Sequence, residues 1–143
     1  MTLPHETFTH LLSQTAHAWR LAVDRQLKHS GLGMSSWMAI ARLSTQTAPV
    51  SQKELALALG LEEATIVPLV DKLIKQQLVE RTQTAEDRRK RLVHITPEGQ
   101  ALYQRLSIEL DKLRSELLAT SSRDELFVAQ RVLQKLLKAI EAK

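Results

Sequence analysis

Apolar residues recur at intervals of three and four along most of the chain, which is the spacing of an amphipathic α-helix. The pattern predicts a long first helix from about Phe8 to Leu27, which ends before Gly31 because glycine commonly follows a helix C-terminus. A second helix is expected to begin at a hydroxyl cap supplied by Ser35 or Ser36.

The middle of the chain predicts a pair of helices joined by a short turn. Ser51-Gln52-Lys53-Glu54 is a capping box, in which a hydroxyl and a carboxylate accept hydrogen bonds from free backbone amides. A short helix follows to Gly60, and a longer amphipathic helix comes next. Its apolar stripe consists of Ile66, Leu69, Val70, Leu73 and Ile74. A short capped helix, a turn containing glycine and a longer helix are typical of the helix-turn-helix motif.

The spacing then changes to the alternation of β-strands. Residues 78–83 and 92–96 predict two short strands, joined by a polar loop over residues 84–91 that contains the basic run Arg88-Arg89-Lys90-Arg91. Such a hairpin beside a helix-turn-helix is a wing. Thr96-Pro97-Glu98 then predicts the start of a long helix, because it combines a hydroxyl cap with proline at the first helical position.

A second capping box, Ser122-Arg123-Asp124-Glu125, opens a last helix that continues to Ile140. The predicted fold is therefore mainly α with a small β-wing. The two terminal helices carry more apolar side chains than one small core needs, which favours a two-fold homodimer. The alternative is a helical hairpin that packs on its own chain.

Composition narrows the class of protein. The chain has 143 residues, enough for a single domain, and 43% of them are hydrophobic. The absence of cysteine excludes disulfides and thiolate catalysis and removes the usual zinc ligands. No apolar run reaches the roughly 18 residues of a membrane span, and the first residues do not resemble a secretory signal, so we expect a cytoplasmic protein.

Binding of double-stranded DNA is the function that these elements favour. The outward face of the second helix of the pair is predicted to carry Ala64, Thr65, Pro68, Lys72 and Lys75. Threonine can bond a base or a phosphate and lysine can reach phosphates. The capped helix start at Ser51 and Gln52 can donate backbone hydrogen bonds to phosphate. Arg88, Arg89, Lys90 and Arg91 can neutralise phosphates or enter a narrow minor groove.

Two other readings remain open. A basic run of four residues is often only a solvated turn, and a helix-turn-helix can be a packing unit that never contacts DNA. The second hypothesis is therefore a protein-interaction module built on the same leucine-rich helices. We expect no enzyme and no cofactor, because no nucleophile–histidine pair, paired carboxylates or glycine-rich phosphate loop is seen. Without cysteine or an acidic partner in register, His5, His10 and His17 do not predict a metal site.

The segment Asp87-Arg88-Arg89-Lys90-Arg91-Leu92-Val93-His94-Ile95-Thr96-Pro97-Glu98-Gly99 resembles the wing signature of the MarR transcriptional regulators. Leu73, followed by Leu78-Val79-Glu80-Arg81, is similar to the family's passage from recognition helix to wing. Trp19-Arg20 and Leu27-Lys28, with Trp37, resemble the SlyA branch.

The resemblance implies a homodimeric winged helix-turn-helix repressor that binds a pseudo-palindromic operator. Residues 35–99 would form the winged helix-turn-helix region, and residues 1–34 and 100–143 the dimerisation helices. Thr65 would lie on the recognition helix, Arg89 would enter the minor groove, and Asp87 would orient the wing arginines. Half-sites would lie roughly 10 bp apart.

Two departures from the family pattern concern the recognition helix. Pro68 stands where relatives often carry an arginine that contacts DNA, so either the helix begins near Thr65, which we slightly favour, or it kinks at Pro68. Glu62 and Glu63 suit the positive end of a helix dipole but repel phosphate. The protein is therefore expected to depend on its wing more than its relatives do.

In SlyA-like proteins a small aromatic carboxylate can bind between the dimer helices and the DNA-binding part and release the DNA. The corresponding positions here are His17, Arg20, Ser35 and Trp37, which offer charge, a hydrogen bond and a stacking surface. The alternative is that Trp19 and Trp37 belong to the core and Arg20 lies in a surface ion pair.

Overall fold

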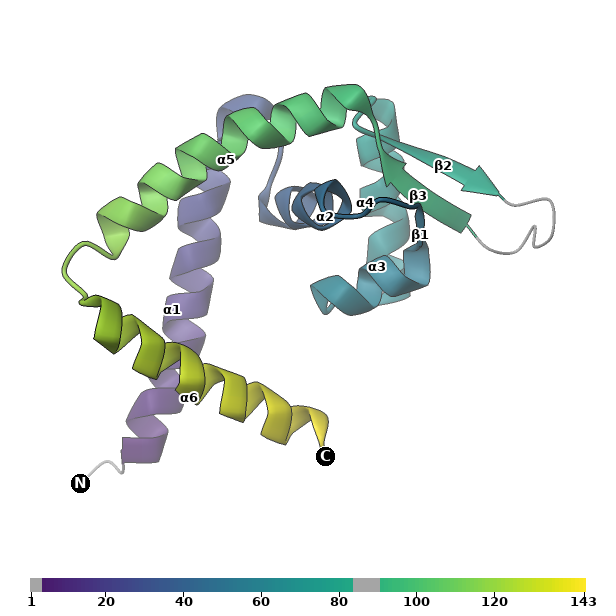
Figure 1. Cartoon of the computed structure of the whole chain (residues 1–143). Coiled ribbons are helices and arrows are strands. Elements are labelled where there is room, and N and C mark those ends of the chain that lie inside the picture. Colours follow the sequence, from purple (N-terminus) through teal and green to yellow (C-terminus); the bar gives the residue numbers. More distant parts are fainter. Residues whose placement is uncertain (1–3, 84–90) are drawn as a thin grey trace. The chain divides into compact units, whose positions relative to one another are not determined.

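A computed structural model describes residues 4–83 and 91–143 and confirms a mainly helical fold with a small sheet (Figure 1). The chain divides into two compact units, residues 1–110 and residues 111–143. The elements are α1 (Pro4–Leu27), the 3-10 helix η1 (Lys28–Ser30), α2 (Met34–Ser44), β1 (Val50–Ser51), α3 (Gln52–Leu59), α4 (Glu63–Lys75), β2 (Val79–Gln83), β3 (Arg91–Ile95), α5 (Pro97–Leu117) and α6 (Arg123–Glu141).

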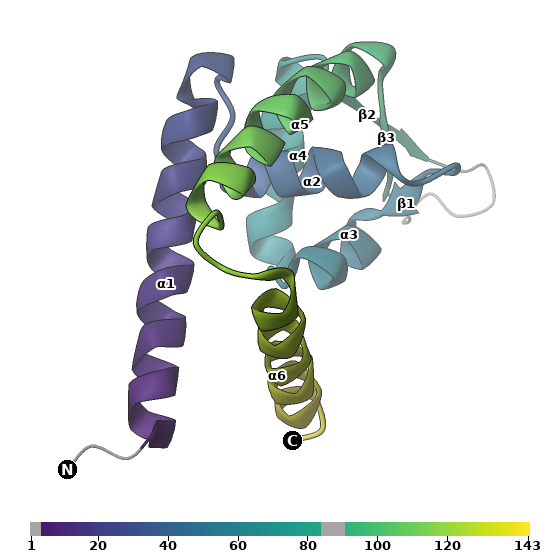
Figure 2. The ribbon, with the colours of Figure 1, turned by 60° about the vertical axis from the view of Figure 1, so that its left-hand side comes forward.

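The sheet has three antiparallel strands in the order β1-β3-β2. The β2–β3 pairing runs from Val79 opposite Ile95 to Gln83 opposite Arg91. Arg91 is thus the first residue of a strand, and its assignment to the loop was wrong. The hairpin extends away from the helices in two views (Figures 1 and 2). The sequence analysis missed β1, whose two residues pair with Val93 and Leu92.

The core of the first unit is aliphatic and draws on each of its α-helices, whereas η1 contributes no buried residue. Its fully buried large side chains are Leu27, Ile40, Leu55, Ile66, Val70, Leu73, Val79, Val93, Leu106 and Leu110. The first helix begins at Pro4, earlier than predicted, and its N-terminal part lies outside this core, since Phe8 is 41% exposed and only Val23 and Leu27 are buried. The C-terminal end of α1 therefore anchors the helix to the rest of the unit.

The start of α2 is capped from another helix. The backbone amide of Met34 donates to Asp24 Oδ1 on α1 at 2.7 Å, and Gly33 occupies the N-cap position without a side-chain bond of its own. The expected cap by Ser35 or Ser36 was wrong, because both serines lie inside the helix. A carboxylate near the helix N-terminus also interacts favourably with the helix dipole, so Asp24 ties α1 to α2.

Pro68 lies inside α4, which begins at Glu63 and continues without interruption to Lys75. The expectation that the helix starts near Thr65 was wrong. Proline has no backbone N–H, so it leaves the Ala64 carbonyl without its intrahelical donor, and a proline in a helix interior costs about 3 kcal/mol relative to alanine. Packing holds the helix together, because Ile66 and Val70 are completely buried on the opposite side.

A short junction connects α4, the hairpin and α5. Gln77 adopts a left-handed backbone conformation, with φ of 63°, two residues before the start of β2. The Thr96 hydroxyl, as predicted, caps α5: it accepts from the Gly99 amide at 3.0 Å and also donates to the Gln77 carbonyl at 2.8 Å. A Cβ at position 99 would strike the Leu78 carbonyl oxygen, so the close approach of backbone here requires glycine.

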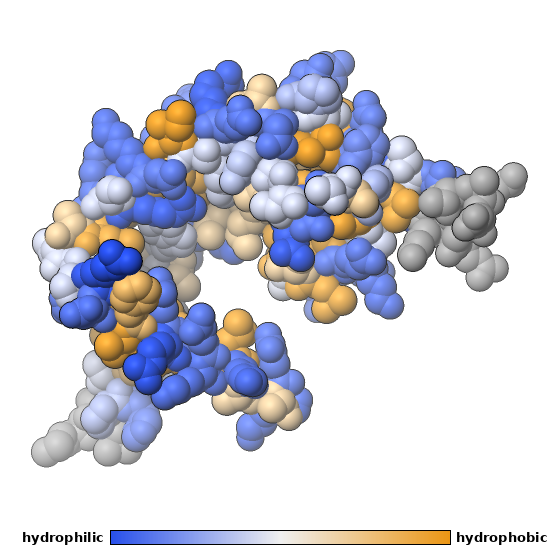
Figure 3. Space-filling view, viewed as in Figure 1, coloured by the Kyte–Doolittle hydropathy of each residue, from blue (hydrophilic) through white to orange (hydrophobic). Residues whose placement is uncertain are grey.

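The second unit consists of the end of α5 and the whole of α6. The predicted capping box opens α6: the Ser122 hydroxyl accepts from the Glu125 amide at 3.1 Å, and the Ser122 amide donates to the Glu125 carboxylate at 2.9 Å. All residues of α6 are described and none is buried. In Figure 3 its visible face carries hydrophobic side chains scattered among hydrophilic ones. The exposed large apolar residues of α6 are Phe127, Val128, Val132, Leu133, Leu137 and Ile140.

Candidate nucleic-acid interface

The helix pair α3–α4 forms as the sequence predicts. Of the predicted capping box one half forms: the Ser51 hydroxyl accepts from the Glu54 amide at 3.0 Å and so begins α3, whereas the reciprocal bond to the Glu54 carboxylate is not formed. Gly60 then ends α3 in a left-handed conformation with φ of 67°, and the Leu61 amide returns to the Ala56 carbonyl at 2.9 Å. These local bonds set the short turn after which α4 begins.

The outward face of α4 is as predicted. Ile66, Val70 and Leu73 are buried, and the opposite face exposes Thr65 and Pro68 among its polar and small residues. The complete set of predicted outward residues, all exposed, is Ala64, Thr65, Pro68, Lys72 and Lys75. Glu62 and Glu63, at the start of the helix, are exposed as well. The face is therefore acidic at its N-terminal end and basic at its C-terminal end.

A polar cluster, Gln52–Arg81–Asp71, connects the helix pair to the hairpin. Arg81 on β2 donates through Nε to Gln52 Oε1 at 2.7 Å and through Nη2 to Asp71 Oδ1 at 2.8 Å. The Arg81 side chain is 23% exposed, so this fork is partly withdrawn from water. Because its planar guanidinium bonds two acceptors in a fixed geometry, Arg81 holds α3 and α4 in register with β2.

Arg81 and Asp71, which hold the site together, were not predicted from the sequence. Arg81 lies two residues after the buried Val79 and therefore on the same, inward face of β2. A charged side chain at an inward position of a strand requires a partner. The alternation of inward and outward positions along β2 was therefore the signal that Arg81 is paired.

Ser51 and Gln52 are buried, each 8% exposed, and their side chains are already hydrogen-bonded. The predicted contact of these two residues with phosphate runs through backbone amides at the start of α3, and it stays a prediction.

The wing strands carry one exposed basic residue of the predicted set. Arg91 is exposed at the start of β3, opposite Gln83. Further along the hairpin, His94 Nε2 lies 3.0 Å from Glu80 Oε2 across the two strands. The predicted contacts Arg88, Arg89 and Lys90, and the orienting residue Asp87, lie outside the described residues.

The structure brings two of the four predicted effector residues together. Arg20 Nη1 donates to Ser35 Oγ at 3.3 Å, which brings two of them together, and His17 is exposed on α1. Trp37 is 6% exposed and stacks on Tyr103, with ring centroids 5.2 Å apart. Trp37 is thus a core residue, as the alternative reading held, and its surface is not free to stack on a ligand.

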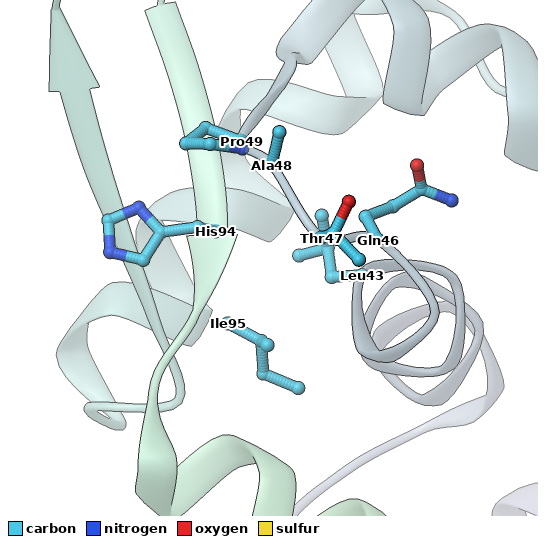
Figure 4. Close-up of a pocket in the computed structure, with 7 residues that line it drawn as sticks. All are labelled: Leu43, Gln46, Thr47, Ala48, Pro49, His94 and Ile95. Atoms are coloured by element: carbon cyan, nitrogen blue, oxygen red, sulfur yellow. The ribbon is translucent and has the colours of Figure 1, made fainter.

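A cavity of about 290 Å³ lies elsewhere, between the end of α2, the loop that follows and β3 (Figure 4). The His94 ring, drawn in that view, turns away from the other lining residues. The cavity is lined by Leu43, Gln46, Thr47, Ala48, Pro49, His94 and Ile95.

Within residues 4–83 and 91–143, no three His, Cys, Asp or Glu side chains gather around a common metal position, and no helix is long and apolar enough to cross a membrane.

A helix pair with an exposed second helix, joined to a small antiparallel sheet with a projecting hairpin, defines the winged helix-turn-helix class. Residues 32–90 match the MarR family, and the chain is 34% identical to transcriptional regulator PA3341, over 95% of this chain and 99% of that one, with a TM-score of 0.84. The chain belongs to the MarR family of transcriptional regulators.

Two further solved structures share the fold. CouR from Rhodococcus jostii RHA1, solved with p-coumaroyl-CoA bound, is 26% identical over 95% of each chain with a TM-score of 0.83. MepR of S. aureus, solved in complex with DNA, is 21% identical, over 93% of this chain and 97% of that one, with a TM-score of 0.86. The MepR match concerns the fold alone.

Proposed function

We propose that the chain is a sequence-specific DNA-binding regulator that occupies a pseudo-palindromic operator as a homodimer. The observation that carries the proposal is the exposed outer face of α4, held by the Gln52–Arg81–Asp71 cluster beside a hairpin whose connecting segment bears the basic run. An α-helix fits the major groove, which is about 12 Å wide. A hairpin placed next to it can follow the adjacent phosphates.

Phosphate contacts come from basic side chains at two places. Lys72 and Lys75 lie at the C-terminal end of the exposed α4 face, and Arg91 lies at the start of β3. Arg88, Arg89 and Lys90 extend this charge in the segment between the wing strands, with Asp87 as their orienting partner. The carboxylates at the start of α4 oppose phosphate, so the wing supplies the larger share of the affinity.

Dimerisation uses apolar surface that neither unit covers by itself. α1 exposes Phe8, Leu11 and Leu21, and α6 exposes six large apolar residues that include Phe127 and Leu133. Hydrophobic surface of this extent marks an interaction site. We assign residues 35–99 to the winged helix-turn-helix region and residues 1–34 and 100–143 to the dimer contacts. Two copies double the number of phosphate contacts that one α4 helix and its hairpin make.

A small aromatic carboxylate is the effector we propose, and its binding releases the operator, as expected for a repressor. Its support here is the exposed Arg20 guanidinium beside Ser35, with His17 one turn away on α1. Trp37 would support this site from the core rather than contact the ligand. We also propose that the chain lies near the SlyA branch, because Trp19-Arg20, Leu27-Lys28 and Trp37 resemble that branch. If salicylate neither displaces bound DNA nor changes tryptophan fluorescence, this part of the proposal is wrong.

The salt dependence of duplex binding tests DNA recognition directly. Fluorescence anisotropy of a labelled duplex across a salt series should show log affinity falling linearly with log salt concentration. Replacing Arg88 and Arg89 with alanine removes two phosphate contacts per chain, so the slope should fall by about 1.8 per chain engaged.

The matched control removes the same charge from a surface outside residues 35–99. Lys28→Ala with Lys112→Ala, both exposed positions, should leave the slope unchanged once sedimentation shows that the variant assembles as the wild-type chain does. Equal slopes for both double variants would contradict the wing contact. No duplex binding at low salt would instead favour the interaction module that uses the same apolar helices.

A further inference from the structure

The first two turns of α4 expose a surface whose side chains offer almost no hydrogen-bond donors. Their exposed residues are Glu63, Ala64, Thr65 and Pro68, and Glu62 precedes them at the N-cap. Among these side chains the Thr65 hydroxyl is the one donor, and arginine, lysine, asparagine and glutamine are absent. The nearest basic side chain of the helix, Lys72, comes one turn after Pro68.

Ala64, Thr65 and Pro68 share one side of the helix, because residues three and four positions apart are neighbours on a helix surface. They present the alanine methyl, the threonine methyl and hydroxyl, and the pyrrolidine ring. We call these three residues the methyl face. It adjoins the two carboxylates at the start of the helix, which makes the whole N-terminal part of α4 unsuited to acceptor-rich partners.

Pro68 is an unfavourable residue for this position, and packing does not explain it. It lacks the N–H that would bond the Ala64 carbonyl, and its ring is exposed rather than used in the core. Natural sequences break such a local rule mainly at functional positions. The exposed side of α4 is also the side that the proposed function places in the major groove.

The edges of the bases then decide what this face can recognise. Guanine offers only acceptors in the major groove, N7 and O6, and its usual readers are arginine and lysine. Thymine offers a methyl group, which alanine, the threonine methyl and other apolar groups contact. A face of three methyl-bearing or apolar groups beside carboxylates therefore complements thymine and disfavours guanine.

We propose that the methyl face reads thymine 5-methyl groups, with Pro68 as the main specificity-determining residue. The inference rests on the proposed function, since it requires α4 to lie in the major groove. It assigns sequence preference to apolar contact, whereas the wing supplies affinity that does not depend on sequence.

Deoxyuridine substitution tests the proposal, because uracil pairs like thymine but lacks the methyl group. A duplex is first selected from a random pool by the intact chain, and single thymines in the bound site are then replaced one at a time. Binding is measured by anisotropy at fixed salt. At contacted positions we expect affinity to fall about fourfold for each methyl removed, the value for one buried methyl-sized group.

The variant Pro68→Ala links the effect to this residue. It restores the helix N–H, so the fold is retained, and the deoxyuridine penalty at the positions read by Pro68 should fall toward onefold. Pro97→Ala, which alters an exposed proline at the start of α5, is the matched control and should keep the full penalty.

The outcomes separate the two proposals. A normal salt slope without any deoxyuridine penalty in the wild-type chain overturns methyl reading and leaves DNA binding intact. A penalty that is equally large in Pro68→Ala overturns the assignment to Pro68. Failure of the wild-type chain to bind any duplex overturns the proposed function and this inference with it.

Discussion

The sharpest prediction concerns Thr96, which attaches the wing to α5. Its hydroxyl donates to the Gln77 carbonyl at 2.8 Å and accepts from the Gly99 amide at 3.0 Å, and the residue is 6% exposed. Thr96→Val keeps the shape and removes both bonds. At about 1 kcal/mol for each bond, with a further penalty for two buried groups left unpaired, we expect the free energy of unfolding to fall by about 2–3 kcal/mol.

Thr96→Ser is the matched control because it keeps the hydroxyl and removes only a methyl group. Its cost should be about 1 kcal/mol, the value for one buried methyl-sized group. Urea unfolding followed by circular dichroism, at one protein concentration for all variants, measures the difference. A valine variant as stable as the serine variant would show that these bonds do not hold the junction together.

Three further predictions concern backbone geometry and pH. Gly99→Ala should lower the melting temperature. Overpacking against the Leu78 carbonyl costs about 1–3 kcal/mol, which is more than alanine gains in helix propensity. An unchanged melting temperature would refute the close approach of residue 99 to the Leu78 carbonyl. Gln77→Gly should be neutral or stabilising by up to about 1 kcal/mol, because it relieves a positive φ, whereas Lys72→Gly inside the helix should cost about 1 kcal/mol. Thermal melts that reverse this order would contradict the left-handed conformation of Gln77. The Ser122 amide, and then its hydroxyl, hold the pKa of the Glu125 carboxyl below its ordinary value, so the associated helix stability is complete above the ordinary glutamate pKa and is lost as pH falls through the lowered pKa. Ser122→Ala keeps the amide and loses the hydroxyl, so NMR titration should find the Glu125 pKa closer to its ordinary value but still below it. An identical pKa in both proteins would exclude the contribution of the hydroxyl.

The parts of the fold that the sequence predicts are those encoded locally. The capping box at Ser122 and the Thr96-Pro97 start of α5 depend on residues within one turn, and both form as expected. The outward face of α4 follows from its spacing alone. Local chemistry is enough at these places because the bonding partners are adjacent in the chain.

The parts that escape prediction depend on residues distant in sequence. Asp24 caps α2 from another helix, and Arg81 bonds Gln52 across 29 positions. Such pairings depend on the packed arrangement of the elements, which periodicity does not report. The start of α4 was misjudged because the penalty of Pro68 was weighed without the buried side chains that sustain the helix.

A hydroxyl-radical footprint of the intact chain on a selected duplex tests the central claim. The claim is that a homodimer presents two copies of α4 and its hairpin to the DNA. The account predicts two protected patches of equal strength on one side of the duplex, separated by about 10 bp, with protection at the flanks lost in the Arg88→Ala, Arg89→Ala variant. A single protected patch, or protection without two-fold symmetry, would contradict it.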